Sequence, residues 1–305
     1  LITKIDQQMG LSIALKDIFA HTSIEKIARL LQQIKPNEQQ IVAIDRANTI
    51  PLTFAQERLW LLYQLQPESP AYNIPSAIQL KGPLNRVALQ AALNDMLARH
   101  EILRAKIVSG VGSAAIEIMP KSSLGINWVS IESPAEDSGS DVDALISEFS
   151  LTPFNLEYDD LVRVMCVALS EELHILCVNI HHIIFDGWSN SIFNEELMVL
   201  YQSHDSGKGT LLQPVHTQYA DFAHWQRGYL QGDVLEEQLA YWVSQLKGIP
   251  AVLSLPTDRP RPAVQTTNGR TLSFTIDGEV TNAAKKYASD NQSTLFMLLL
   301  GTYQL

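Results

Sequence analysis

Two apolar runs joined by a short polar link form the strongest pattern in the sequence. Residues 162–169 and 173–181 consist mostly of large apolar side chains, and Ser170-Glu171-Glu172 separates them. Runs of this length, rich in β-branched residues and joined by a polar turn, predict a β-hairpin. Side chains alternate along a strand, so a strand persisting through His182 would place the rings of His181 and His182 on opposite faces.

Helical spacing of apolar residues predicts most of the other elements. Residues 87–99 fit one helix, and residues 190–201 fit another that Ser189 can cap. Residues 110–140 contain little strand pattern. Further strands are expected at 76–80, 105–108 and 271–276, and further helices at 145–154, 219–226, 280–289 and 295–305. A helix from about residue 54 is expected to pack through Phe54, Arg58, Leu61, Leu62 and Leu65.

The first 49 residues differ from the rest of the chain. Residues 1–35 predict short helices of a small bundle, because an apolar stripe follows a cap at Thr22. The stripe consists of Ile24, Ile27, Ala28, Leu31 and Ile34. Residues 36–49 are polar with little periodicity and are typical of a linker. Leu1 begins and Leu305 ends within a helix-like pattern, so we expect this sequence to be a fragment of a longer protein.

Composition narrows the class of protein. A chain of 305 residues, 46% hydrophobic and 18% charged, has room for about two globular domains. The net charge of -11 argues against nucleic-acid and anionic-membrane partners, because phosphate binding needs clustered Lys and Arg. No run approaches the ~20 apolar residues of a membrane helix, and no signal peptide opens the sequence. Cys166 and Cys177 are expected to be buried reduced thiols; a disulfide between hairpin partners is the alternative.

The candidate chemistry lies just after the second apolar run. His181 and His182 are followed by Asp186 and Gly187, at a predicted strand-to-helix corner. Such corners often carry functional residues, although a lone histidine in an apolar strand is more often a core residue. Because the two rings diverge, a convergent metal pair is not expected. We expect one histidine to face an open cleft and the other to pack inside.

The spacing at this corner resembles a known motif. His181-His182-x-x-x-Asp186-Gly187-Trp188-Ser189 resembles the core motif of the condensation domains of nonribosomal peptide synthetases. Chloramphenicol acetyltransferase and its relatives share only the shorter His-x-x-x-Asp-Gly form. Other stretches resemble further parts of the condensation pattern: Ala55-Gln56-Glu57-Arg58-Leu59-Trp60 with Tyr72-Asn73-Ile74-Pro75, Arg99-His100-Glu101-x-Leu103-Arg104, residues 219–226, Tyr241-Trp242, and residues 255–262. The first of these is closest to the subtype that accepts an L-configured donor.

The resemblance implies an α/β (α+β) fold with the two lobes of chloramphenicol acetyltransferase. Residues 50–228 would form the N-terminal lobe and residues 229–305 the start of a truncated C-terminal lobe. Residues 1–35 resemble the C-terminal part of a peptidyl carrier domain, a partial helical bundle, with 36–49 as the linker. This truncated chain alone is expected to be inactive, because the substrate tunnel lies between two complete lobes.

The resemblance also implies a reaction and a site. The amine of a downstream carrier-bound aminoacyl thioester attacks an upstream acyl or peptidyl thioester and forms an amide. His182 would act on the amine as base or positioning group, with His181, Asp186 and Gly187 completing the catalytic corner. Arg99 would pair with Asp186. The remaining residues implied to support the site are Arg104, Trp188 and Ser189.

Partners and cofactor follow from the same resemblance. They are upstream and downstream peptidyl carrier domains and an adjacent adenylation domain, in a cytoplasmic synthetase of secondary metabolites such as antibiotics. Phosphopantetheine would arrive on those carriers, and no metal is implied. Two alternatives remain: a non-catalytic docking platform with the condensation fold, and an acyltransferase that uses free coenzyme A. The intact histidine motif argues against the first, and the carrier-like residues 1–35 argue against the second.

The carrier resemblance makes one prediction. The phosphopantetheine serine of that family lies in a Gly-Gly-x-Ser motif, which would precede Leu1. Ser12 and Ser23 match nothing in the pattern. Incubation of the 305-residue chain with a promiscuous phosphopantetheinyl transferase and coenzyme A should therefore leave its intact mass unchanged. A gain of one arm, mapped to Ser12 or Ser23 by peptide mass spectrometry, would contradict the carrier alignment.

Overall fold

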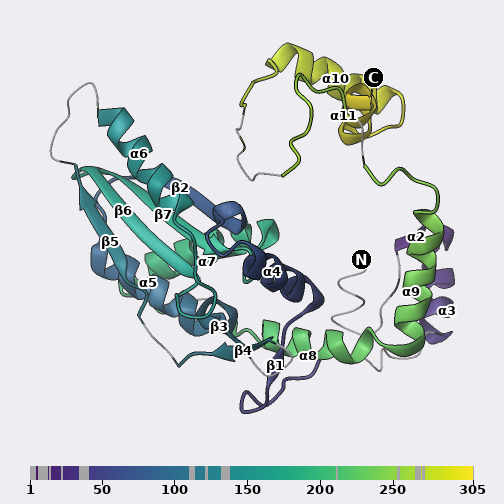
Figure 1. Cartoon of the computed structure of the whole chain (residues 1–305), viewed down its shortest axis with the longest axis horizontal. Helices are drawn as coiled ribbons and strands as arrows, with labels where there is room; N and C mark the ends of the chain where they lie inside the picture. Colours follow the sequence, from purple (N-terminus) through teal and green to yellow (C-terminus); the bar gives the residue numbers. More distant parts are fainter. Residues whose placement is uncertain are drawn as a thin grey trace. The chain divides into compact units, whose positions relative to one another are not determined.

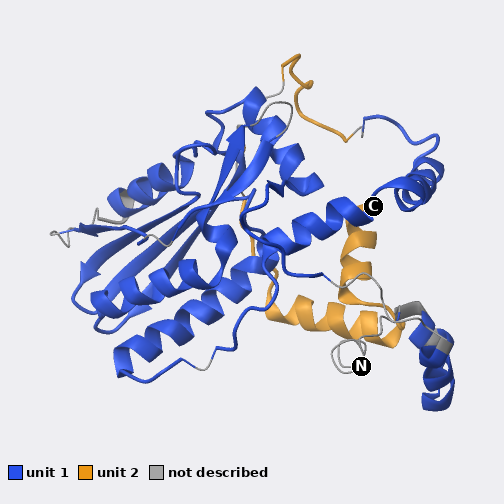
Figure 2. Ribbon diagram, turned by 90° about the horizontal axis from the view of Figure 1, so that it is seen from below, with its two compact units in different colours: residues 1–254 blue, residues 255–305 orange. Residues whose placement is uncertain are grey.

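The computed structural model describes most of the chain in two units. The described residues are 5, 13, 15–21, 23–33, 41–109, 114–120, 123–131, 138–210, 212–252, 255–264, 269 and 272–304. Contacts within the chain group residues 1–254 into one unit and residues 255–305 into the other, shown in blue and orange in Figure 2. None of the helices in these described ranges is long and apolar enough to cross a membrane.

A four-stranded sheet carries the candidate site. Its strands lie in the order β2 (Asn73–Lys81), β7 (Leu173–His181), β6 (Val162–Ser170) and β5 (Ile126–Ser130). The predicted hairpin is confirmed as β6 and β7, which pair antiparallel with Cys166 opposite Leu176. β2 pairs antiparallel with the other side of β7, and Asn73 lies opposite His181. β5 runs parallel to β6.

Helices cover both faces of this sheet. α5 (Arg86–Arg99) and α7 (Gly187–Ser206) pack on one face, and α6 (Ser138–Leu151) lies over the other (Figure 1). Alternation along β7 assigns its side chains to these two layers: Leu176, Val178 and Ile180 join the α5–α7 core. Cys177 joins the smaller cluster beneath α6. The sheet therefore has a hydrophobic layer on each side.

The two cysteines lie in different layers. Cys166 belongs to the α5–α7 core and Cys177 to the cluster beneath α6, and both thiols are buried and free. Burial raises the pKa of Cys166 to about 11. The prediction of buried reduced thiols is confirmed.

A second, smaller sheet stands beside the first. It consists of β1 (Ile50–Pro51), β4 (Ala114–Ile118) and β3 (Ala105–Ser109), in that order. The expectation that residues 110–140 contain few strands was wrong, because β4 and β5 both lie there. Each is five residues long and flanked by Gly, Ser or Pro, so its own pattern is weak and its partners in the sheet stabilise it.

α4 (Phe54–Leu65) buries a different face from the predicted one. Its buried residues are Gln56, Leu59 and Trp60, whereas Leu61 and Leu65 of the predicted stripe are exposed. Thr53 and Gln56 form a reciprocal capping box at the start of the helix. A glutamine can replace an apolar residue inside because its amide has partners for both donor and acceptor.

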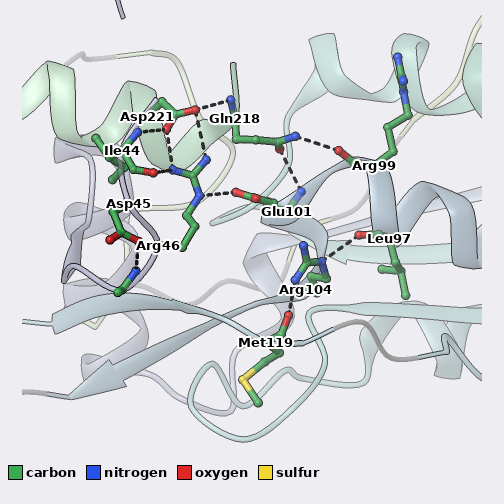
Figure 3. A network of polar contacts seen from close by, with 11 residues as sticks. Ile44, Asp45, Arg46, Leu97, Arg99, Glu101, Arg104, Met119, Gln218 and Asp221 are labelled. Atoms are coloured by element: carbon green, nitrogen blue, oxygen red, sulfur yellow. Dashed lines mark hydrogen bonds and ion pairs between the residues drawn. The ribbon is translucent and has the colours of Figure 1, made fainter. Parts of the chain in front are cut away.

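Residues 41–47 dock on α8 (Tyr219–Tyr229) through an ion pair between half-buried Arg46 and buried Asp221 (Figure 3). Arg46 Nη1 lies 2.6 Å from Asp221 Oδ1, and Asp221 is only 1% exposed. The Asp221 carboxylate also accepts the backbone N–H groups of Ile44 and Gln218, at 2.9 and 2.8 Å. Burial alone raises the pKa of Asp221, but these bonds outweigh it and hold the pKa below its ordinary value.

The same arginine reaches the connection after α5. Arg46 Nε lies 2.6 Å from Glu101 Oε2, and Glu101 begins the 3₁₀ helix η2 (Glu101–Arg104). Gln218 completes the link by donating to the carbonyl of Arg99 and accepting the N–H of Glu101. Three segments that are distant in sequence therefore share one polar cluster (Figure 3).

The first helices form a cluster of their own. α2 (Leu15–Ala20) and α3 (Ile24–Gln33) surround a small apolar group that includes Ile13, Ile27 and Leu31. Ile24 was predicted to point inward but is 89% exposed. Thr22, Ile34 and Ser12 lie outside the described residues. α9 (Gly232–Gln245) has no buried residue among those described.

The second unit contains α10 (Gly278–Asp290) and α11 (Leu295–Gln304), close to the predicted helices. Asp277 caps α10 by accepting the N–H of Val280. The strand expected at 271–276 was wrong for residues 272–276, which pair with none of the described strands. Thr271 lies outside the described residues. Alternating apolar side chains alone do not make a strand without a neighbour to complete its hydrogen bonds.

The Arg46–Asp221 pair generates a stability prediction. Asp221→Ala should lower the free energy of unfolding by about 3 kcal/mol, because it leaves Arg46 and two backbone N–H groups without their buried acceptor. Asp45→Ala is the matched control, since exposed Asp45 only accepts the N–H of Ala47. Urea denaturation measures both. Equal losses in the two variants would show that the ion pair does not hold residues 41–47 in place.

Candidate active site

β7 ends at His181, and the chain turns sharply after it. The N–H of Ile184 donates to the carbonyl of His181 at 3.1 Å, and the N–H of Ile183 donates to His181 Nδ1 at 3.1 Å. The turn then buries Ile183, Ile184 and Phe185 in the α5–α7 core. His182 is the first residue of this turn, so the strand does not persist through it.

The His181 ring is buried and structural. It is 5% exposed and packs edge-on against Phe154, with 6.0 Å between ring centroids, and near Tyr72 at 6.5 Å. Burial lowers the pKa of His181 to about 4, and the charge of His182 adds to this. The ring is therefore neutral at pH 7. Because Nδ1 accepts a hydrogen bond, the proton resides on Nε2.

The His182 ring is exposed. Its backbone N–H donates to the carbonyl of Tyr72 at 2.8 Å, which fixes the residue against the start of β2. Within the described part of the chain, no side chain hydrogen-bonds its imidazole. Both ring nitrogens are thus available to another molecule. Of the two neighbouring histidines, His181 is therefore buried and His182 is exposed.

Asp186 caps α7 and carries a negative charge beside His182. Its carboxylate accepts the N–H of Ser189 at 2.8 Å and the hydroxyl of Ser189 at 2.6 Å. The Ser189 hydroxyl, followed by the Ser189 N–H, lowers the pKa of Asp186, and the charge of His182 contributes. The prediction that Ser189 caps a helix from residue 190 was wrong. Asp186 accepts the same kind of bond three residues earlier, and Ser189 supports it from the first turn.

Gly187 and Trp188 form the exposed first turn of α7. Gly187 is the first helical residue, and a Cβ placed there would meet nothing within 4 Å. A side chain at this position would therefore have room. Trp188 is 81% exposed, so its ring contributes little to the core.

Arg99 does not pair with Asp186, contrary to the prediction. It binds Glu196 of α7 through two bonds of 3.0 Å, and donates to the carbonyl of Gln213 at 2.6 Å. Asp186 precedes Glu196 by ten residues, which is about 15 Å along a helix and beyond the reach of this guanidinium. Arg99 therefore fastens α5 to α7, and Asp186 is an exposed cap.

Glu196 is a residue that the sequence patterns missed. Besides Arg99, it has His100 Nε2 2.5 Å from its Oε2. Burial alone raises the pKa of Glu196, but the bonds from Arg99 and His100 outweigh this and keep the pKa below its ordinary value. Nothing in the sequence distinguishes it from Glu195, because only the rotation of α7 against α5 decides which one turns inward.

Arg104 supports the connection after α5. Its guanidinium donates to the carbonyls of Leu97 and Met119, which ties the end of α5 to the residue after β4 (Figure 3). The structure does not bring Arg104 to the histidine corner.

Three polar residues from elsewhere form a chain of contacts that ends at the corner; Thr53 and Gln56 are buried, and Tyr219 is half-buried. Gln56 Nε2 donates to the carbonyl of Ile183 at 3.0 Å, and Thr53 Oγ1 lies 3.2 Å from Tyr219 Oη. Burial raises the pKa of Tyr219, and the charge of Asp186 adds to the rise. Thr-x-x-Gln before an apolar run is a capping-box pattern that the sequence offered. The sequence does not indicate that the Gln56 amide donates to the carbonyl of Ile183.

The arrangement suits proton transfer or orientation of a polar group. An exposed imidazole lies beside a carboxylate at the start of a helix, on a turn held from several sides. An imidazole can accept a proton near neutral pH and can hold an amine by a hydrogen bond. Within the described residues, no group of three or more His, Cys, Asp or Glu side chains could hold a metal ion.

Comparisons with known proteins point to one family. A family model described as "Condensation domain" matches residues 46–305. Malpinin synthetase of Mortierella alpina is 37% identical over 97% of this chain and 4% of its own length. Surfactin synthase subunit 1 of Bacillus subtilis (strain 168) is 31% identical over 99% of this chain and 8% of its own length. The chain thus spans a small part of these relatives.

Solved structures share the fold. The X-domain from teicoplanin biosynthesis is 29% identical with a TM-score of 0.72, over 83% of this chain and 56% of that one. The first condensation domain of the calcium-dependent antibiotic synthetase, solved with a substrate analogue, is 22% identical with a TM-score of 0.67, over 81% and 57%. They confirm the predicted α/β fold of the chloramphenicol-acetyltransferase type.

The pairing found for Arg99 generates a double-mutant prediction. Asp186→Ala removes an exposed cap and should cost about 1 kcal/mol of the free energy of unfolding. Glu196→Ala strands Arg99 and His100 in a half-buried place and should cost about 3 kcal/mol.

Two cycles measured by urea denaturation separate the possible partners of Arg99. Arg99→Ala and Glu196→Ala should be coupled by about 1 kcal/mol or more, whereas Arg99→Ala and Asp186→Ala should add to within about 0.5 kcal/mol. Strong coupling of Arg99 with Asp186 would restore the pairing expected from the sequence.

Proposed function

Because the chain belongs to the condensation-domain family, we propose that it forms amide bonds in a nonribosomal peptide synthetase. The donor is an acyl or peptidyl thioester on an upstream carrier, and the acceptor is the amine of an aminoacyl thioester on a downstream carrier. One observation carries this proposal. The His182 ring is exposed on a turn, and the ring of the preceding His181 is buried and neutral.

The chemistry sets a modest task for His182. An α-amine has a pKa of roughly 7.7–8, so much of it is already neutral near pH 7 and can attack the thioester carbon. Attack forms the C–N bond and leaves a tetrahedral intermediate with an ammonium and an oxyanion. His182 orients the amine, accepts the ammonium proton, or does both. The C–S bond then breaks, and the donor carrier regains its thiol.

The rest of the corner supports that task. Neutral His181 and the buried residues 183–185 hold the turn, so His182 is presented from a rigid base. Asp186 places a negative charge beside the His182 ring. Gly187 has no Cβ, so backbone N–H groups at the start of α7 would be able to approach the reacting thioester closely.

The finer parts of the proposal concern what surrounds this domain. We assign residues 1–35 to the C-terminal part of a carrier domain, 36–49 to a linker, 50–228 to the first lobe and 229–305 to the second. The similarity to surfactin synthase subunit 1 extends over 99% of the chain, which supports including the first residues in a synthetase. Phosphopantetheine on the carriers, an adjacent adenylation domain, an L-configured donor and a cytoplasmic location complete the assignment. The product class is a peptide secondary metabolite.

A docking platform is the second candidate. The X-domain from teicoplanin biosynthesis has also been solved in a complex with OxyB, at 29% identity to this chain and a TM-score of 0.71. A fold of this kind can therefore hold another protein. A platform, however, needs no exposed imidazole on a rigid turn, and this favours catalysis here.

Mutation of the exposed ring separates the two candidates. In a synthetase in which this domain stands between its two loaded carriers, His182→Ala should reduce dipeptide formation about 100-fold or more. The melting temperature should stay near that of the unchanged protein, because the ring is exposed. His204→Ala, which removes a partly exposed histidine near the end of α7, is the control and should leave the rate unchanged. Full condensation by His182→Ala would refute the catalytic proposal and favour the platform.

A further inference from the structure

A chain of three polar side chains, of which two are buried and Tyr219 is half-buried, connects α8 and α4 to the histidine corner. It runs from Tyr219 Oη to Thr53 Oγ1, from Thr53 to the side chain of Gln56, and from Gln56 Nε2 to the carbonyl of Ile183. Thr53 and Gln56 are 1% and 2% exposed. The contact between Gln56 and Ile183 joins residues 127 positions apart, and His182 is the neighbour of that carbonyl.

The two halves of the Gln56 amide have separate partners. Oε1 accepts the backbone N–H of Thr53 at 3.0 Å and its hydroxyl at 3.2 Å. In return, the N–H of Gln56 donates to Thr53 Oγ1 at 3.2 Å. These bonds complete the helix cap without the amide nitrogen. Nε2 is directed instead to the turn that carries His182, so capping accounts for only half of the side chain.

The bond from Gln56 to the Ile183 carbonyl comes from α4, and not from the strand that leads into the turn. His181 accepts the N–H groups of Ile183 and Ile184, and Tyr72 accepts the N–H of His182. A longer bond of 3.5 Å runs from the N–H of Phe185 to the carbonyl of His182 and also lies within the turn. The first two act within three residues, and the third fixes the start of the turn. Gln56 holds the peptide between Ile183 and Ile184, one residue beyond His182, and connects it to α4. α4 packs in the same core through Leu59 and Trp60. His182 is thus held on both its N-terminal and C-terminal sides.

We infer that Gln56 is a positioning residue for His182, and that Thr53 and Tyr219 hold its amide in the orientation required. Its donor fixes the Ile183 carbonyl and with it the direction of the His182 imidazole. The charge of Asp186 contributes to the raised pKa of Tyr219. Both ends of this chain of side chains, Tyr219 and Gln56, therefore interact with residues of the histidine corner. This inference rests on the proposed function for its effect on rate, but its effect on the turn is independent of that function.

Amide hydrogen exchange in this chain tests the effect on the turn. Gln56→Met keeps the length of the side chain but removes both polar atoms. The amides of His182 and Ile184 should then lose at least ten-fold more protection than the amide of Val178 in the middle of β7. Asn85→Ala removes a cap of α5, far from the corner, and serves as the control for a general loss of stability. It should not single out the corner amides.

Kinetics test the effect on the reaction. In the loaded synthetase, Gln56→Met should lower kcat at least ten-fold while KM for the carriers stays within two-fold, and Asn85→Ala should change neither. Gln56→Glu gives a signature that a purely structural role would not give. An ionised carboxylate keeps the acceptor for Thr53 but cannot donate to Ile183, whereas the protonated acid can donate. Its rate relative to the unchanged enzyme should therefore recover as the pH falls from 8 to 6.

The outcomes separate this inference from the proposed function. Unchanged exchange at His182 and Ile184 in Gln56→Met would overturn the inference, as would a loosened turn with an unchanged kcat. A flat rate ratio for Gln56→Glu would also count against it. If His182→Ala retains full condensation, the proposed function fails, and the exchange experiment still decides whether Gln56 holds the turn.

Discussion

The site depends on where β7 stops. Up to Ile180 the strand alternates between two hydrophobic layers, and His181 is its last residue. There the buried imidazole accepts the N–H of Ile183, so the next backbone donor is satisfied by a side chain instead of a neighbouring strand. The chain then turns, buries residues 183–185 and leaves His182 in solvent.

Burial of the His181 ring makes stability depend on pH. The pKa of the ring is about 4 in the folded protein and 6.5 in the unfolded chain, so the unfolded chain binds a proton at a higher pH than the folded protein does. The contribution of His181 to the free energy of unfolding should therefore decrease by about 3 kcal/mol as the pH is lowered from 6.5 to 4.

Buried polar contacts between distant segments hold the rest of the corner. Gln56 brings the start of α4 to the turn, and Glu196 fixes α7 to α5 through Arg99. Arg46 and Asp221 fasten residues 41–47 to α8, which also supplies Tyr219. Each contact satisfies groups that would be costly to bury alone, and each joins elements far apart in sequence. Rigid support of this kind is what a catalytic ring on a turn requires.

The sequence predicted those features that depend on local pattern. The hairpin of β6 and β7 and the helices α5, α10 and α11 follow from periodicity within one segment. One histidine is inside and the other is exposed, as expected, but the turn after His181 produces this division and not alternation along a strand. The motif around His181 and His182 led to the fold, which the comparisons confirm. β4 and β5 were missed, because short strands next to Gly and Pro draw their stability from neighbours in the sheet.

The errors at the site have a common cause. Arg99 could reach several carboxylates as far as the sequence shows, and only the packing of α5 on α7 selects Glu196 over Asp186. The buried face of α4 was misassigned because Gln56 looks like a surface residue until its amide partners are known. In the same way, Ser189 and Asp186 are both good caps, and the end of β7 decides which one begins α7.

One histidine of the pair is buried and neutral, and the other is exposed to solvent. The most direct test is a titration of the histidine rings by ¹⁵N NMR, with His181 assigned from its loss in His181→Gln. We expect His181 to keep its proton on Nε2 and to stay neutral down to a pH of about 4. Titration of the His181 ring near pH 6.5, or a proton on Nδ1 at pH 7, would show that the ring is not buried and neutral.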